Sequence, residues 1–251
     1  MVTYLYCVLT AADGGPSVVG LGEVPVRALY LGPRGPLELW VATIDEATLQ
    51  TSGRALGAQA LAHNDVVSAA LATGRTPIPA RFGMHFPDDA ACMATLESRA
   101  PQLRSTLARL AGTVEMSVIL SPSRLRLERQ HLSLPTRGEP FAGRRYLETV
   151  RARARHDEAT MSMYGQLIVD VSRAVRAITR DESGVRTGRG IVSIAHLLRR
   201  EDESRYRDAV RAVTMPNDVH VIVAGPRAPY NFAGPSALDI GHDSGSPDHN
   251  G

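Results

Sequence analysis

The order of strand-like and helix-like segments most constrains what this chain can fold into. Strand patterns lie at residues 3–9, 24–31, 37–44 and 113–120. Two helical patterns, at residues 53–73 and 88–112, separate the third strand pattern from the fourth. Strands followed by helices that pack on them predict an α+β fold, not a doubly wound sheet.

Local features support these segments. Residues 3–9 (TYLYCVL) are rich in β-formers and apolar on both faces, which is typical of a central strand. In residues 37–44, Leu and Val alternate with Glu38, Trp40 and Ala42, which indicates a strand. Asp88 is a suitable N-cap for the second helix, in which Pro101 predicts a kink.

The second half begins with a segment that breaks regular structure. Prolines and a glycine between residues 121 and 142 predict a domain boundary. Residues 143–180 then contain no proline and place apolar side chains at alternating steps of three and four, which predicts a long helix. The remaining patterns are an apolar segment at 191–198, a short helix near 202–213 and a strand at 219–224.

We therefore expect two α+β domains, at residues 1–130 and 136–235. The first is expected to be mostly an antiparallel sheet with two helices, for which a ferredoxin-like arrangement is one option. The second is expected to contain the long helix 143–180 and short strands. Residues 236–251 consist mainly of Gly, Ser, Pro, Asp and His, and predict a disordered tail.

Composition excludes several classes of protein. The longest stretch without a charged residue is residues 1–12, whereas a membrane span needs about 20 apolar residues. The N-terminus has no basic region before an apolar one, so we expect no secretory signal. Cys7 and Cys92 lack metal-ligand spacing and are expected to be buried small hydrophobes in a reducing compartment. We expect a cytoplasmic protein.

Charge leaves one alternative open. All 28 basic residues are arginines, which excludes lysine chemistry such as Schiff bases, and the net charge is only +2. Residues 136–215 nevertheless carry a net charge of +5, from 16 arginines and 11 acidic residues. An Arg-rich nucleic-acid-binding or regulatory protein is therefore the alternative function, with steeply salt-dependent binding. Its arginines would be Arg144, Arg145, Arg151, Arg153 and Arg155.

The sequence shows no pattern of residues that carries catalysis. It contains no GxGxxG, GxxxxGK[ST], HExxH, GxSxG or CxxC motif. Its eight histidines are scattered without an i, i+4 pair, and each is interpreted as a surface or hydrogen-bonded core residue. We therefore expect no enzyme, no metal and no cofactor; a polar pocket around His63 and Asp65 would argue for an enzyme instead.

Short motifs in order along the chain point to a known family. They are YLYCV at 4–8, HNDVV at 63–67, PIPARFG at 77–83, GRRYL at 143–147 and GPRAPYNF at 225–232. This series resembles the gas vesicle protein F/L family (GvpF/GvpL), whose pattern is approximately HNxVV, LPxRFG, GRxYL and GPWPPYSF. The chain departs from it at Ile78, Arg227 and Ala228, where the family has Leu, Trp and Pro.

The resemblance implies an accessory protein for gas vesicle assembly, with two α+β domains and no catalysis. It implies the hydrophobic shell protein GvpA and other accessory proteins as partners. We expect neither nucleic acid nor a membrane as a partner. The protein would keep GvpA competent for assembly, or join the vesicle as a minor component.

The candidate partner-binding residues divide into two groups. The first lies on and beside one helix, and the second follows the last strand; they are His63, Asn64, Arg81 and Phe82, and Tyr230 and Phe232. For each group a structural role stays open. Asn64 and Arg81 could fix the proline loop by hydrogen bonds while Phe82 fills core, and Tyr230 and Phe232 could pin the terminus to the core.

Overall fold

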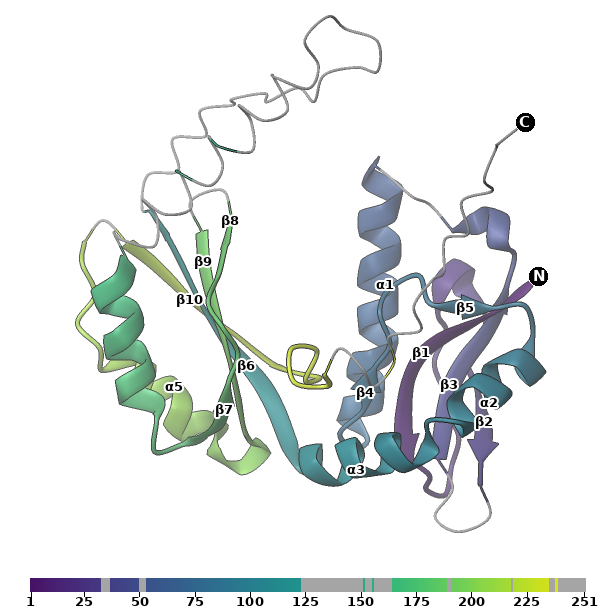
Figure 1. Cartoon of the computed structure of the whole chain (residues 1–251). Helices are drawn as coiled ribbons and strands as arrows, with labels where there is room; N and C mark the ends of the chain where they lie inside the picture. Colours follow the sequence, from purple (N-terminus) through teal and green to yellow (C-terminus); the bar gives the residue numbers. More distant parts are fainter. Residues whose placement is uncertain are drawn as a thin grey trace, which may run out of the picture. The chain divides into compact units, whose positions relative to one another are not determined.

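A computed structural model places most of the chain in two compact units (Figure 1). The first comprises Met1–Gly112 with Ala228–Gly251, and the second comprises Thr113–Arg227. The described residues are 1–32, 37–49, 53–122, 151, 155, 164–188, 191–217, 219–234 and 238. Both units combine an antiparallel sheet with helices, which confirms the predicted α+β class.

The first unit is built around its N-terminal strand. Its strands are β1 (Val2–Thr10), β2 (Arg27–Leu31), β3 (Leu37–Ile44), β4 (Ile78–Pro79) and β5 (His85–Phe86). They lie in the order β2-β3-β1-β4, and β5 also pairs with β1. Residues 2–9 of β1 are buried, as expected of an apolar strand between two others. The hairpin predicted between residues 31 and 37 is confirmed, because β2 pairs antiparallel with β3.

Helices cover the first sheet. The helices are α1 (Gly53–Ala72), α2 (Asp89–Glu97) and α3 (Ala100–Leu110), with short 3-10 turns at Leu21–Glu23 and Glu46–Thr48. Val66, Val67 and Ala70 of α1 pack against Tyr4 and Trp40 in one core. The apolar residues of α2 and α3 are buried as well, including Cys92 and Leu103. The packing of α1 on the sheet therefore fixes which face of this helix is exposed.

The predicted second helix is divided into two. The Asp88 side chain accepts from the Ala91 backbone N–H at 2.8 Å, so the predicted N-cap is confirmed. The single kinked helix is wrong, because α2 ends at Glu97 and α3 begins at Ala100. Proline is tolerated in the first turn of a helix but not in its interior, and Pro101 therefore starts a new helix instead of bending one.

The second unit has a ferredoxin-like topology. Its strands are β6 (Thr113–Pro122), β7 (Thr179–Glu182), β8 (Arg186–Gly188), β9 (Ile191–Arg199) and β10 (Val219–Arg227). Helical residues 164–175 precede β7, and α5 (Glu203–Arg211), after a 3-10 turn at Arg200–Asp202, precedes β10. The antiparallel order β10-β6-β9-β7, with β8 also beside β9, is that of a split βαβ arrangement. The sequence left a ferredoxin-like arrangement open for the N-terminal domain, but this arrangement occurs in the second unit.

The structure divides the chain at positions other than the predicted boundary. β6 pairs with β9 and β10, so residues 113–122 belong to the second unit rather than the first. Ala228 is part of the first unit's core. A proline-rich segment marks where regular structure stops, but strand pairing decides which unit a strand belongs to.

Two other predictions concern the second half. The predicted end of the helix at residue 180 is wrong, because turn residues follow position 175 and β7 begins at Thr179. Thr179, Asp181 and Glu182 pair with β9, and this pairing outweighs the helical spacing that continues to Ile178. Most of residues 123–163 and of the predicted tail lie outside the described residues, and so do Arg144, Arg145 and Arg153 of the arginine cluster. Arg151 and Arg155 of that cluster are described, helical and exposed. Within that tail, Leu238 is described and buried.

Candidate functional site

His63 lies at the centre of a buried hydrogen-bond chain in the first unit. The Tyr4 hydroxyl accepts from the Gly83 backbone N–H at 3.0 Å and lies 2.9 Å from His63 Nδ1. His63 Nε2 lies 3.2 Å from the Ala80 carbonyl oxygen. A neutral imidazole protonated at Nε2 satisfies both contacts, since Nδ1 then accepts from Tyr4 and Nε2–H donates to Ala80. Strand β1, helix α1 and the loop 80–83 are thereby tied together.

Aromatic rings surround this histidine. Its ring centroid lies 5.7 Å from that of Tyr4, 5.5 Å from that of Tyr6 and 5.9 Å from that of Phe82. Burial among these rings disfavours the imidazolium and lowers the pKa of His63 to about 4, although the Ala80 carbonyl acts in the opposite direction. Burial also raises the pKa of Tyr4, and the nearby Tyr230 adds to that effect. The arrangement suits structural hydrogen bonding and holds the histidine neutral.

The predicted partner-binding residues therefore differ in accessibility. His63 is buried and Phe82 is half-buried against it. Asn64 is half-buried, with its amide 3.4 Å from the Ser68 hydroxyl, and Arg81 is exposed. Phe82 is thus a ring contact of His63, while Asn64 and Arg81 are adjacent in sequence to these two residues. Tyr230, which the sequence placed in the other group, lies near Tyr4. The structure gives His63 and Phe82 a role in packing.

The C-terminal motif has one accessible aromatic and one buried one. Tyr230 is 37% exposed, whereas Phe232 is buried and its carbonyl accepts from Arg109 at 2.5 Å. The backbone N–H groups of Phe232 and Ala233 both donate to the Pro229 carbonyl. This turn holds the segment on the first unit, which favours a packing role for Phe232.

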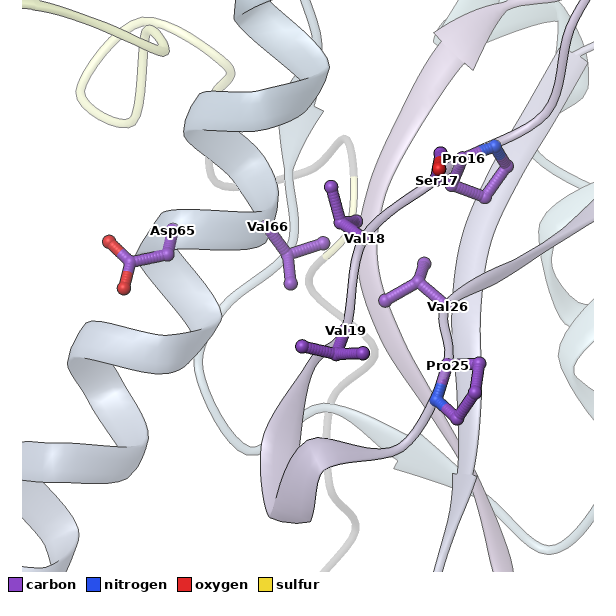
Figure 2. A pocket seen from close by; sticks show the side chains of 8 residues that line it. All are labelled: Pro16, Ser17, Val18, Val19, Pro25, Val26, Asp65 and Val66. Atoms are coloured by element: carbon purple, nitrogen blue, oxygen red, sulfur yellow. The ribbon is translucent and has the colours of Figure 1, made fainter.

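A pocket of about 660 Å³ lies between α1 and the segment that precedes β2. Figure 2 shows Val66 directed from the helix toward Val18 and Val19 on that segment. The lining is mainly apolar, and Asp65 is its charged residue; the full set is Pro16, Ser17, Val18, Val19, Pro25, Val26, Asp65 and Val66. The pocket opens to solvent, so it can accept an apolar side chain of another protein.

One helical turn before the lining residue Asp65, α1 carries another exposed apolar side chain. Leu61 is 67% exposed and Val19 is 60% exposed. Residues three and four apart share a helix face, so Leu61 lies on the same side as Asn64 and Asp65. Residues 55–64 of the helix include no charged residue. We call Val19, Leu61 and the residues lining the pocket the α1 surface.

Sequence reasoning missed the α1 surface. Residues 16–19 attract attention only as a loop, and Leu61 is one of many apolar residues in an alanine-rich helix. Exposure of single apolar residues is normal, so neither residue stands out before the fold places Val19 at the pocket and Leu61 one helical turn before the lining residue Asp65.

Tyr6 anchors the pocket segment to the core. Its hydroxyl accepts from the Leu21 backbone N–H at 2.8 Å, and a Cβ on Gly20 would lie 2.0 Å from the same oxygen. We expect Gly20→Ala to lower the free energy of unfolding by about 2 kcal/mol, because the segment or Tyr6 must move. Urea unfolding followed by fluorescence of Trp40, the single tryptophan, measures this. Gly15→Ala is the control, because its Cβ meets no atom within 4 Å; equal losses in both variants would contradict the prediction.

Each sheet also contains a buried carboxylate. Glu38 accepts from Trp40 Nε1 at 2.6 Å and forms an ion pair with Arg75. Glu115 forms an ion pair with Arg227 at 2.7 Å. Arg227 stands where the family pattern has Trp, and this ion pair gives the substituted position a defined role in the second unit.

A second histidine network lies in the second unit. His196 is buried, with Nδ1 2.8 Å from the Tyr206 hydroxyl and Nε2 3.2 Å from a Glu182 carboxylate oxygen. Burial lowers the pKa of His196, while Glu182 acts in the opposite direction. The network joins β7, β9 and α5, and its three residues were not grouped by sequence reasoning. No sequence pattern identifies this network, because its contacts depend on which residues of β7 and β9 lie opposite each other.

Other kinds of site lack support in the described part of the chain. Within it, no group of three or more His, Cys, Asp and Glu side chains could hold a metal ion. A search of the same residues finds no helix with the length and apolar character needed to cross a membrane.

The chain is a two-unit α+β protein. Its α1 surface is exposed and apolar, which is typical of a surface that contacts another protein. A family model described as gas vesicle synthesis protein GvpL/GvpF matches residues 2–234. The chain therefore belongs to the GvpL/GvpF family, which confirms the resemblance and a role in gas vesicle formation. A relative, gas vesicle protein L of Streptomyces sp. (strain CB03234), is 28% identical over 253 residues, which cover 94% of each chain.

Solved structures show the same fold. The crystal structure of gas vesicle protein GvpF from Anabaena sp. PCC7120 matches with a TM-score of 0.66 and 18% identity, over 93% of this chain and 98% of that one. GvpF from Microcystis aeruginosa matches with a TM-score of 0.63 and 16% identity, over 93% and 99% of the two chains. The two-sheet α+β architecture is therefore shared across nearly the whole chain.

Proposed function

We propose that this chain is a non-catalytic accessory protein of gas vesicle assembly that binds the hydrophobic shell protein GvpA through the α1 surface. The observation that carries the proposal is the exposed, uncharged part of α1 beside an open apolar pocket. A shell protein with a gas-facing side exposes apolar surface before it assembles, and such surface aggregates unless a partner covers it. Asn64, Arg81 and Tyr230 would form the polar rim of the contact.

In this account the protein acts in the cytoplasm and at the growing vesicle. Covering the apolar side of GvpA keeps it competent for assembly, and a complex that persists would leave the chain in the vesicle as a minor component. Other accessory proteins of the vesicle would bind outside the α1 surface.

The experiment compares two matched charge substitutions during co-expression with a GvpA-type shell protein. Leu61→Glu places a charge in the α1 surface, whereas Val169→Glu places one at a 48% exposed apolar residue of the second unit. We expect Leu61→Glu to reduce co-purified shell protein at least about tenfold, since a buried unpaired charge costs more than about 1.4 kcal/mol. Val169→Glu should leave co-purification unchanged. Equal effects of both substitutions, or none from Leu61→Glu, would exclude the α1 surface as the binding site.

A further inference from the structure

β10 forms one edge of the second sheet, with β6 as its neighbour (Figure 1). Arg207 Nη1 donates to the Val223 carbonyl at 3.4 Å, so this carbonyl points away from β6. On the other side, the Glu115 carbonyl lies 2.7 Å from where a Cβ on Gly225 would be, so it points toward β10. Backbone groups alternate in direction along a strand, and Val219, Val221 and Val223 therefore present their N–H and C=O groups to the open edge.

Some of these groups already have partners. The Val219 N–H donates to the Pro216 carbonyl at 3.1 Å, and Arg207 occupies the carbonyls of Val223 and Gly225. Among the described residues, no other group hydrogen-bonds to this edge. Four groups are left, which are the Val219 C=O, the Val221 N–H, the Val221 C=O and the Val223 N–H.

We propose that β10 pairs antiparallel with β10 of a second copy of this chain, about a twofold axis at Val221. Each Val221 would exchange two hydrogen bonds with Val221 of the second copy. Each Val223 N–H would donate to the Val219 carbonyl of the second copy. The pairing uses all four remaining groups on each copy. The two groups it leaves unused, the Val219 N–H and the Val223 C=O, are the ones that already have partners.

The side chains of β10 suit pairing with themselves. Residues 219–225 (VHVIVAG) carry no Asp, Glu or Arg, so two copies bring no like charges into contact. Ile222 is 56% exposed and would lie opposite His220 of the second copy, which covers it. Proteins commonly block an open edge with charge or proline, and here Arg207 and Pro226 do so only toward one end. The central residues stay available for pairing.

Cysteine crosslinking of the full chain tests the register directly. In the proposed pairing the two Val221 Cα atoms lie about 5.5 Å apart, which permits a disulfide. The two Val219 residues lie about 14 Å apart, which does not. Both side chains are half-buried on the same face of β10, and the native Cys7 and Cys92 are buried, so Val219→Cys is a matched control.

Under mild oxidation we expect Val221→Cys to give at least about ten times as much disulfide-linked dimer as Val219→Cys, measured on a non-reducing gel. Equal crosslinking of the two variants would overturn the proposal, since random collision or another mode of contact explains it. Absence of crosslinking in both, with circular dichroism showing a folded protein, would also overturn it.

Sedimentation of the full chain provides a second measurement. Val221→Pro removes an N–H that faces the open edge, so it leaves the hydrogen bonds to β6 intact. We expect the wild-type chain to dimerise with rising concentration, and Val221→Pro to raise the dimer dissociation constant at least about tenfold. A wild-type chain that stays monomeric throughout would contradict the proposal. If Val221→Pro fails to fold, the crosslinking result decides.

Discussion

Replacing Arg75 by alanine is expected to lower the free energy of unfolding by about 3 kcal/mol, a larger loss than we expect from Gly20→Ala. Glu38 is fully buried in β3, and the Arg75 side chain is 18% exposed. Arg75 also donates to the Thr10 carbonyl at 3.1 Å. Its removal leaves a buried carboxylate without its counter-charge, and that loss exceeds the value of any single exposed pair.

Urea unfolding followed by Trp40 fluorescence measures this effect. Arg27→Ala is the matched control, because Arg27 and Asp89 form an ion pair at 2.7 Å whose side chains are 38% and 39% exposed. We expect it to cost no more than about 1 kcal/mol. Adding Glu38→Gln to Arg75→Ala should restore stability, since Gln can still accept from Trp40 Nε1 without a buried charge. A loss from Arg75→Ala no larger than from Arg27→Ala would contradict this interpretation.

The first unit is expected to lose about 2 kcal/mol of stability between pH 7.5 and pH 5 through His63 alone. The pKa of His63 is lowered from 6.5 to about 4 in the folded chain by burial. Between these two values the unfolded chain binds more protons than the folded one. Stability is therefore fully present above pH 6.5 and is lost as the pH falls toward 4.

The measurement is the pH dependence of urea unfolding, again followed by Trp40. In a His63→Gln variant the slope between about pH 6.5 and pH 5 should be much reduced, whatever the variant's overall stability. His85→Gln is the control, because His85 lies half-buried in the same unit and contacts the Gly83 carbonyl. It should keep the wild-type slope. An unchanged slope in His63→Gln would show that another group causes the acid sensitivity.

Local patterns predicted the longer strands and the helix starts well, but not the short strands β4, β5, β7 and β8. The strand at 37–44 is observed with the same bounds, and Asp88 caps its helix as expected. These features depend on neighbouring residues, which the sequence displays directly. The end of helix 143–180 was wrong because β7 pairs with β9, and spacing within the helix contains no information on that partner.

The site was predicted only in part, for a similar reason. The motifs brought His63 together with the loop at Arg81 and Phe82, which the structure bears out as neighbours. The alternation in residues 37–44 places Glu38 on the opposite face of the strand from its apolar neighbours. Glu38 is nevertheless buried, and it is paired with Arg75, which lies 37 positions away in the sequence. The α1 surface likewise combines Val19 and Leu61, whose exposure follows from the packing of two distant segments.

Co-expression with a GvpA-type protein is the decisive measurement for the proposed role, in which this chain covers the apolar surface of a gas vesicle shell protein. We expect the shell protein to stay in the soluble fraction and to co-purify with this chain. We also expect the complex to survive high salt, because apolar contacts are not screened by ions. If the shell protein precipitates while this chain elutes free, the proposed role is wrong, and if the complex dissociates in salt, the contact is not apolar.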